Sequence, residues 1–211
     1  MDARDARDRR VEMLRTLVLG LAAVATAWST YQGGSWRGEQ AAETRQSTAA
    51  HIESSEAATR AGQLTMIDVG TFTQWVDATA TGETELAAFY QQRFRAEFQP
   101  AFEAWLATQP LTDPDAPPTP FALPEYRLAE TEKSERLNRE ATERSAAAGR
   151  ANRHADEYLL ATVLFATALF FAGISAKPES RLQGEILLGL GGLAFLGAAL
   201  WLATLPTSFG R

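Results

Sequence analysis

Few residues in this chain are of types that perform chemistry. Its 211 residues include two histidines, His51 and His154, and no cysteine. Histidine and cysteine are the usual ligands of zinc, and histidine is the usual base that activates a catalytic serine. The lack of cysteine excludes disulfides and thiolate metal sites, and two isolated histidines support neither a metal centre nor a triad. We therefore predict no catalytic, metal-binding or cofactor-binding residue, and a protein that is not an enzyme.

Two further patterns have a chemical interpretation that the sequence disfavours. The glycine-rich run at 33–38 lacks the lysine and the strand-to-helix setting of a phosphate-binding loop, so we interpret it as a flexible exit from an apolar stretch. Asp68 lies between Ile67 and Val69, and Asp77 follows nine residues later. A carboxylate on the flank of a helix is more often solvated or salt-bridged than catalytic.

Six of the nine prolines lie at 110–124, and a helix cannot continue through them. This composition predicts a stiff, extended strap, pinned to the rest of the domain by Leu111, Phe121 and Leu123. The alternative is a polyproline recognition site, because Pro114 and Pro117 have PxxP spacing, as do Pro117 and Pro120. We favour the strap, because the domains that read such motifs act mostly in the cytosol.

Three stretches are long and apolar enough to cross a bilayer, which takes roughly 20 residues. The sequence therefore predicts an all-α protein with three transmembrane helices and one helical extramembrane domain, a hairpin or bundle of long helices with the proline-rich loop at 110–124. The expected order is an N-terminal segment 1–12, transmembrane helix 13–31, domain 32–157, transmembrane helix 158–176, link 177–185, transmembrane helix 186–205 and tail 206–211. The first stretch also resembles a secretory signal with a cleavage site at Ala25-Thr26-Ala27, and we favour a retained anchor.

Basic residues near the ends of the apolar stretches predict the orientation. The segment 1–12 contains four arginines, and the link contains Lys177 and Arg181. By the positive-inside rule, both lie in the cytoplasm and the domain lies outside it. The preference for arginine over lysine, with abundant alanine, is typical of a bacterium with a GC-rich genome. In a bacterium, a protein with three transmembrane helices is expected in the inner membrane. The domain carries 20 acidic and 12 basic residues, which argues against a nucleic-acid partner.

Two uncharged stripes with alternating steps of three and four predict the long helices of the domain. Such spacing lets helices pack side by side, so we expect the two stripes to form the seam of an antiparallel stalk, with the second helix continuing into the second apolar stretch. The alternative is that an alanine-rich helix shows small residues on any stripe. The first stripe is Thr48, Ile52, Ser55, Thr59, Gly62, Met66, Val69, Thr73 and Val76; the second is Thr131, Ser134, Asn138, Ala141, Ser145, Ala148, Asn152, Ala155, Leu159 and Thr162.

The segment 86–106 between the stripes is rich in aromatic residues, which we expect to form the core of the domain. Gly82 is the natural turn residue after the first helix, and Pro100 predicts a kink or a new helix starting at Ala101. The charged residues of this segment are expected to form a solvated face with i to i+4 pairs; they are Arg93, Arg95, Glu97 and Glu103. In the third apolar stretch, close helix packing is expected along Gly189, Gly192, Ala199 and Ala203.

The chain resembles a family of bacterial three-span membrane proteins with a helical extramembrane domain. The local sequences at 27–32, 93–98, 158–165 and 171–175 are similar to sequences in this family. The resemblance implies the topology described above and supplies no site residue. We predict a non-enzymatic integral membrane protein whose outer domain binds a partner, senses or scaffolds, with a protein partner or a second copy besides the lipid. The alternative is an oligomeric channel or an accessory subunit of a transport complex.

Overall fold

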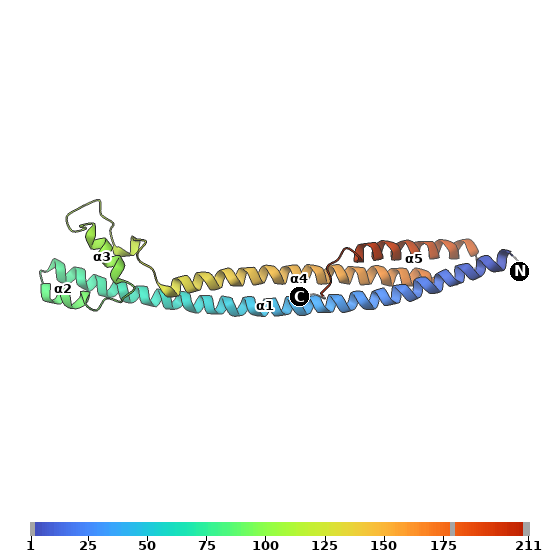
Figure 1. Cartoon of the computed structure of the whole chain (residues 1–211), viewed down its shortest axis with the longest axis horizontal. Helices are drawn as coiled ribbons and strands as arrows, with labels where there is room; N and C mark the ends of the chain where they lie inside the picture. The colour runs from blue at the N-terminus through green and yellow to red at the C-terminus, as the bar shows by residue number, and fades with distance from the viewer. Residues whose placement is uncertain (1–2, 178–179, 209–211) are drawn as a thin grey trace. The chain divides into compact units, whose positions relative to one another are not determined.

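The computed structural model describes residues 3–177 and 180–208 (Figure 1). Within these ranges the chain is 81% helical and contains no strand, which confirms the predicted all-α class. Parts of the predicted segments 1–12, 177–185 and 206–211 lie outside the described residues. The five α-helices are α1 (Ala3–Ala80), α2 (Thr84–Gln91), α3 (Gln99–Ala107), α4 (Ala129–Ile174) and α5 (Arg181–Leu202), and a short 3₁₀ turn, η1, covers Pro120–Ala122.

The chain divides into two compact units. Unit 1 consists of Met1–Arg45 and Arg144–Arg211, and unit 2 consists of Gln46–Glu143. Helices α1 and α4 each contribute to both units, as expected for the second stripe, which runs without a break into the second apolar stretch. Helix α1 also runs without a break through 33–38, so the predicted flexible exit is wrong. Gly33 lies close to α4 there, since a Cβ at this position would be in van der Waals contact with Tyr158 Cβ, at 3.4 Å.

Unit 1 is built on helices α1, α4 and α5, and each contains a stretch long and apolar enough to cross a membrane. At one end of the unit, Arg7 pairs with Glu185 at 2.9 Å, and Arg15 Nε donates to Ser175 Oγ at 2.9 Å. At the other end, Trp36 and Tyr158 both donate to the carbonyl oxygen of Pro206, at 3.2 and 3.1 Å. Helix α4 therefore runs antiparallel to α1 and α5.

Small residues let α5 approach α4 closely. The buried residues of α5 are Gly184, Gly191 and Ala198, spaced by seven. Of the predicted stripe, Gly192 and Ala199 are partly buried, whereas Gly189 and Ala203 are exposed, so the prediction is wrong for these two. A Cβ on Gly191 would lie 3.1 Å from the carbonyl oxygen of Ala168, whereas a Cβ on Gly192 would meet nothing within 4 Å.

Replacing Gly191 with leucine should therefore separate α5 from α4. Overpacking of this kind costs about 1–3 kcal/mol, and the variant should unfold at a lower temperature than the wild-type chain in the same detergent. Gly192→Leu is the matched control, because nothing lies within 4 Å of a Cβ at that position. Equal melting points for the two variants would contradict the described packing.

In unit 2, α1 and α4 pack as an antiparallel pair, as predicted. Ser47 Oγ donates to the carbonyl oxygen of Ala141, and Ser54 Oγ donates to that of Ser134, both at 2.8 Å. A serine hydroxyl reaches the backbone of a neighbouring helix only where the two helices are very close. The small residues of this seam make that approach possible.

The predicted seam of α1 is wrong, because all nine residues of the first stripe are exposed. The buried residues lie two positions further along the helix, and we call them the inner face: Ala50, Ser54, Ala57, Ala61, Asp68, Phe72, Trp75 and Ala78. The second stripe is half right. Ser134, Ala141, Ala148 and Ala155 are at least partly buried, whereas Asn138, Ser145 and Leu159 are exposed. Ala151 and Tyr158, which were not in the predicted stripe, are also buried and alternate with the correctly predicted residues.

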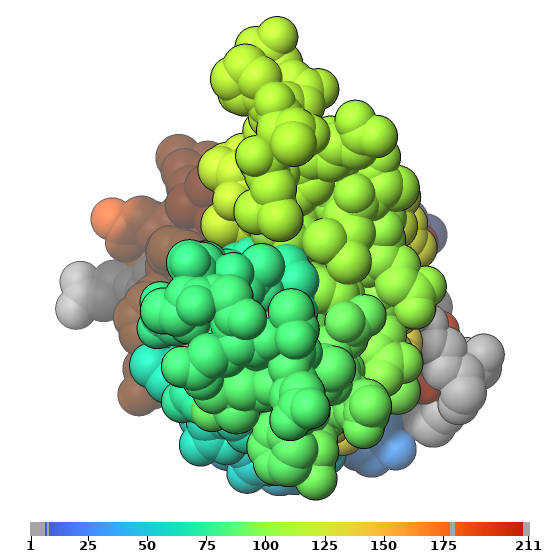
Figure 2. Space-filling view, turned by 90° about the vertical axis from the view of Figure 1, so that its left-hand side faces the viewer, coloured from blue at the N-terminus to red at the C-terminus, as the bar shows by residue number. Residues whose placement is uncertain are grey.

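Helices α2 and α3 lie at the C-terminal end of α1 in unit 2 (Figures 1 and 2), and an aromatic core joins α1 to α3 there. Gly82 turns the chain after α1 with φ +76°, and Pro100 lies in the first turn of α3, as the sequence predicts. The buried members are Phe72, Trp75, Phe94, Phe98, Phe102 and Trp105, and the partly buried residues packed against them include Phe121, Leu123 and Tyr126.

The proline-rich segment follows α3, and η1 is its one helical element besides a few hydrogen-bonded turns. Phe121 and Leu123 pack against the aromatic core as expected, and Trp105 Nε1 donates to the carbonyl oxygen of Pro117 at 2.8 Å. Leu111 is 71% exposed, so its predicted role in pinning the segment is wrong. The attachment is made by residues 117–123 instead.

Candidate functional site

A cluster of polar side chains lies inside unit 2, and we call it the Asp68 cluster: Thr65, Asp68, Arg95, Glu97 and Tyr126. Asp68 Oδ2 accepts from Arg95 Nη1 at 2.8 Å and from the Tyr126 hydroxyl at 3.0 Å. Tyr126 also contacts Thr65 Oγ1 at 3.3 Å. Arg95 pairs with Glu97, whose Oε1 accepts from the backbone N–H of Ala129 at the start of α4, at 3.2 Å. The cluster thus joins α1, the turn after α2 and the beginning of α4.

Burial governs the electrostatics of this cluster. The side chain of Asp68 is 1% exposed, and burial raises the pKa of its carboxyl, against the lowering effects of Tyr126 and Arg95. Burial also raises the pKa of Tyr126. Asp68 Oδ1 has no hydrogen-bond partner among the described residues. A carboxylate this deeply enclosed has no access to a substrate from solvent, so we assign the cluster a structural role.

The sequence predicted this cluster only in part. Asp68 is salt-bridged, which was one of its two expected states. The expected solvated face with i to i+4 pairs is wrong for Arg95 and Glu97, because residues 92–98 are not helical and Arg95 points to α1. Arg93 lies over the ring of Phe89, 3.4 Å from its centre. No local sequence pattern predicts the ion pair between Asp68 and Arg95, which are 27 residues apart in the chain.

A second candidate is the side of α1 that faces away from its packing partners in unit 2. We call it the outer face, and it consists of the nine exposed residues of the first stripe: Thr48, Ile52, Ser55, Thr59, Gly62, Met66, Val69, Thr73 and Val76. The inner face is displaced from it by two residues, which is about 200° around a helix. One side of α1 is therefore packed within the chain, and the opposite side is not.

The outer face presents a more apolar surface than its serine and threonine residues suggest. It carries no charged residue, and Met66 is 77% and Ile52 55% exposed. Ser55, Thr59 and Thr73 donate their hydroxyl protons to carbonyl oxygens one turn earlier in α1, at 2.8–3.0 Å. Because these hydroxyls are already hydrogen-bonded, covering them with an apolar surface removes little that water alone provides.

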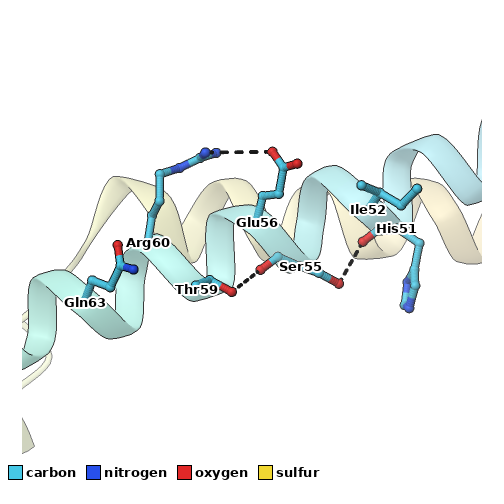
Figure 3. A pocket seen from close by; sticks show the side chains of 7 residues that line it. All are labelled: His51, Ile52, Ser55, Glu56, Thr59, Arg60 and Gln63. Carbon is cyan, nitrogen blue, oxygen red and sulfur yellow. Dashed lines mark hydrogen bonds and ion pairs between the residues drawn. The ribbon is translucent and has the colours of Figure 1, made fainter.

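A shallow depression lies along part of this face (Figure 3). Its lining side chains all come from α1: His51, Ile52, Ser55, Glu56, Thr59, Arg60 and Gln63. Arg60 is held at its edge by Glu130 at 3.2 Å. Small molecules usually bind in concave sites that enclose most of their surface. A depression on one side of a single helix suits an elongated partner, such as another helix, better than a small ligand.

Unit 1 buries two polar residues on α1 that the sequence analysis did not single out. Gln32 and Ser29 are fully buried, and Gln32 Oε1 accepts from the Ser208 hydroxyl at 2.8 Å. Gln32 Nε2 and Ser29 Oγ have no partner among the described residues. The oxygen of Gln32 thus ties the segment after α5 to α1.

Within the described residues, no group of three or more histidine, aspartate or glutamate side chains is arranged to hold a metal ion. The chain matches no protein-family model, no curated protein and no solved structure. The outer face and the Asp68 cluster are therefore interpreted from their geometry alone.

Proposed function

We propose that this chain is a non-enzymatic integral membrane protein of the bacterial inner membrane, crossing it at 13–31, 158–176 and 186–205. The apolar surface of unit 1 supports this. Of the three apolar stretches, only 6%, 28% and 11% of the residues are buried inside the structure. A water-soluble monomer rarely exposes so much contiguous apolar surface, so lipid is the natural cover. The exposed residues include Leu14, Leu17, Leu21, Val24, Leu160, Val163, Phe170, Ile186, Leu190, Leu193, Leu196 and Leu200.

The proposed orientation has the N-terminus in the cytoplasm and residues 32–157 outside it. The contacts of Arg7 with Glu185 and of Arg15 with Ser175 bring the basic N-terminal segment to the same end of unit 1 as Lys177 and Arg181. Basic residues concentrate on the cytoplasmic side of membrane proteins. The end formed by Trp36, Tyr158 and Pro206 then faces outward.

In this proposal, the extramembrane part binds a protein partner, and the observation that carries this is the outer face of α1. It is an uncharged helix surface with 3.5-residue spacing, and all nine of its residues are exposed. Such a surface is what helix-in-groove and coiled-coil recognition use. The channel alternative has less support, because the backbone of α4 of the same chain lies 3.1 Å from a Cβ position at Gly191 of α5.

Single cysteines in this cysteine-free chain test the membrane topology. In intact cells with a permeabilised outer membrane, a membrane-impermeant maleimide should label Glu53→Cys and leave Lys177→Cys unlabelled until the inner membrane is broken. The wild-type chain should sediment with membranes and require detergent for extraction. Recovery in the soluble fraction, or labelling of Lys177→Cys in intact cells, would contradict the proposal.

A further inference from the structure

We infer that Arg15 and Lys177 form a binding site in unit 1 for the phosphate group of an anionic phospholipid. The inference rests on the proposed function, because it requires unit 1 to be embedded in a bilayer. It adds to that function a lipid of defined headgroup chemistry, bound at the end of unit 1 where α1 meets the C-terminus of α4.

A buried serine holds Arg15 in place. Ser175 directly follows α4 and is 3% exposed, and its hydroxyl donates to the carbonyl oxygen of Ala172 at 2.7 Å. The same hydroxyl accepts from Arg15 Nε at 2.9 Å, and the carbonyl oxygen of Ser175 accepts from Arg15 Nη2 at 3.2 Å. A guanidinium has five N–H groups, so Arg15 keeps three of them for a further ligand while its position is fixed.

No carboxylate balances the charge of Arg15 within the part of the chain that the structure describes. Glu12, one turn earlier in α1, is exposed and forms no ion pair with it, and Glu185 pairs with Arg7. The carbonyl end of a helix carries only about half a negative charge, so the end of α4 offsets Arg15 in part. Arg15 is itself partly buried, and a cation at the start of an apolar stretch is costly without an anion beside it.

Lys177 supplies a second positive charge beside the first. It follows Ser175 by two residues, so the Cα atoms of these two residues are at most about 7 Å apart. Its backbone N–H donates to the carbonyl oxygen of Ile174 at 3.0 Å, which fixes it in the turn that closes α4. Its side chain is exposed. Arginine binds phosphate through paired hydrogen bonds and lysine as a point charge, so the two cations together suit a phosphodiester with a single negative charge.

The apolar neighbours of Arg15 indicate that the phosphate belongs to a lipid. Leu14 and Leu17 lie beside it on α1 and are 56% and 54% exposed. The acyl chains of a bound phospholipid would cover such side chains, whereas free phosphate would leave them uncovered. An anionic lipid fits better than a zwitterionic one, because the ammonium group of a zwitterionic headgroup would be repelled by Arg15 and Lys177.

Native mass spectrometry of the purified full chain in neutral detergent tests the inference. The chain should bind one phosphatidylglycerol molecule at concentrations at which neither phosphatidylcholine nor inorganic phosphate binds. Arg15→Gln should weaken this binding at least about tenfold, the usual effect of losing a hydrogen bond between charged groups. Arg10→Gln is the matched control, because Arg10 is an exposed arginine of the same helix, and its loss should change the affinity less than about twofold.

Lys177→Gln separates lipid binding from folding. The side chain of Lys177 is exposed and forms no ion pair within the described residues, so its Tm in lipid-free detergent should equal that of the wild type while phosphatidylglycerol binds more weakly. If Lys177→Gln kept the wild-type affinity, or lost no more than Arg10→Gln, the site would be overturned.

The remaining results separate this inference from the function on which it rests. Equal affinities for phosphatidylglycerol and phosphatidylcholine would overturn the anionic-lipid site and leave the membrane protein intact. Inorganic phosphate that binds as tightly as phosphatidylglycerol would overturn the assignment to a lipid. A chain that is recovered in solution without detergent would overturn both the site and the proposed function.

Discussion

Phe98→Ala should lower the free energy of unfolding of unit 2 by about 3–5 kcal/mol, the usual cost of removing a buried aromatic ring. Phe98 is 0% exposed and lies among the rings of Phe94, Phe121 and Tyr126, with centre distances of 5.0, 5.1 and 6.0 Å. For a unit of this size, the loss corresponds to a fall in Tm of at least about 12 °C. In detergent, the amides of α2 and α3 should exchange their hydrogens at least about 100-fold faster, since 1.4 kcal/mol is a factor of ten.

Leu111→Ala is the control for this prediction. The side chain of Leu111 is 71% exposed, and a surface substitution of this kind changes stability by less than about 0.5 kcal/mol. A similar loss in both variants would show that Leu111 does pin the proline-rich segment. An unchanged Tm for Phe98→Ala would show that the aromatic rings face outward.

Asp68→Ala should destabilise unit 2 by about 3 kcal/mol, because it leaves Arg95 partly buried without one of its two carboxylate partners. The side chains of Asp68 and Arg95 are 1% and 23% exposed, and Arg95 keeps its pairing with Glu97. The loss should appear as faster hydrogen exchange where the cluster joins α1 to the turn at 92–98. Asp77→Ala, an exposed carboxylate on the same helix, should have little effect. Equal effects would mean that the ion pair contributes nothing.

The pH dependence of stability gives a second measure of the contribution of Asp68 to the free energy of unfolding. Because burial raises the pKa of Asp68 above its ordinary value of 3.8, the folded state binds the proton more tightly than the unfolded state. The contribution of Asp68 is therefore largest below that value, and it decreases as the pH rises through the folded-state pKa. Asp68→Asn retains an acceptor for Tyr126 and has no such titration, so its stability should vary less with pH over this window than that of the wild type.

Local chain signals predicted the boundaries of several elements correctly. Gly82 and Pro100 mark the end of α1 and the start of α3, because only certain residues suit a positive φ or lack a backbone N–H. The aromatic core was predicted in part: Phe94, Phe98, Phe102 and Trp105 are buried as expected, whereas Phe89 is 46% exposed, and the core members Phe72 and Trp75 of α1 were not predicted. The glycines at 33–38 led to the wrong prediction of a flexible segment. A glycine within a helix also permits close packing, as Gly33 does against Tyr158.

The choice between the two faces of α1 could not be made from the sequence. Both faces have heptad-like spacing, and the absence of charge favoured the wrong one. The inner face contains Asp68, a charged residue whose burial depends on Arg95 and Tyr126, which come later in the chain. The predicted seam was thus placed on the wrong side of α1, and all nine of its residues are exposed.

The chain segments that make up the two units determine the order in which the units can fold during synthesis. Unit 2 is one continuous stretch, whereas unit 1 is split around it. The hydrogen bond from Trp36 to Pro206 joins residues 170 positions apart, and that from Ser208 to Gln32 joins residues 176 apart. A ribosome completes everything that unit 2 needs before it makes α5. The extramembrane part can therefore reach its native structure while α1 still awaits α5, and the helices of unit 1 assemble last.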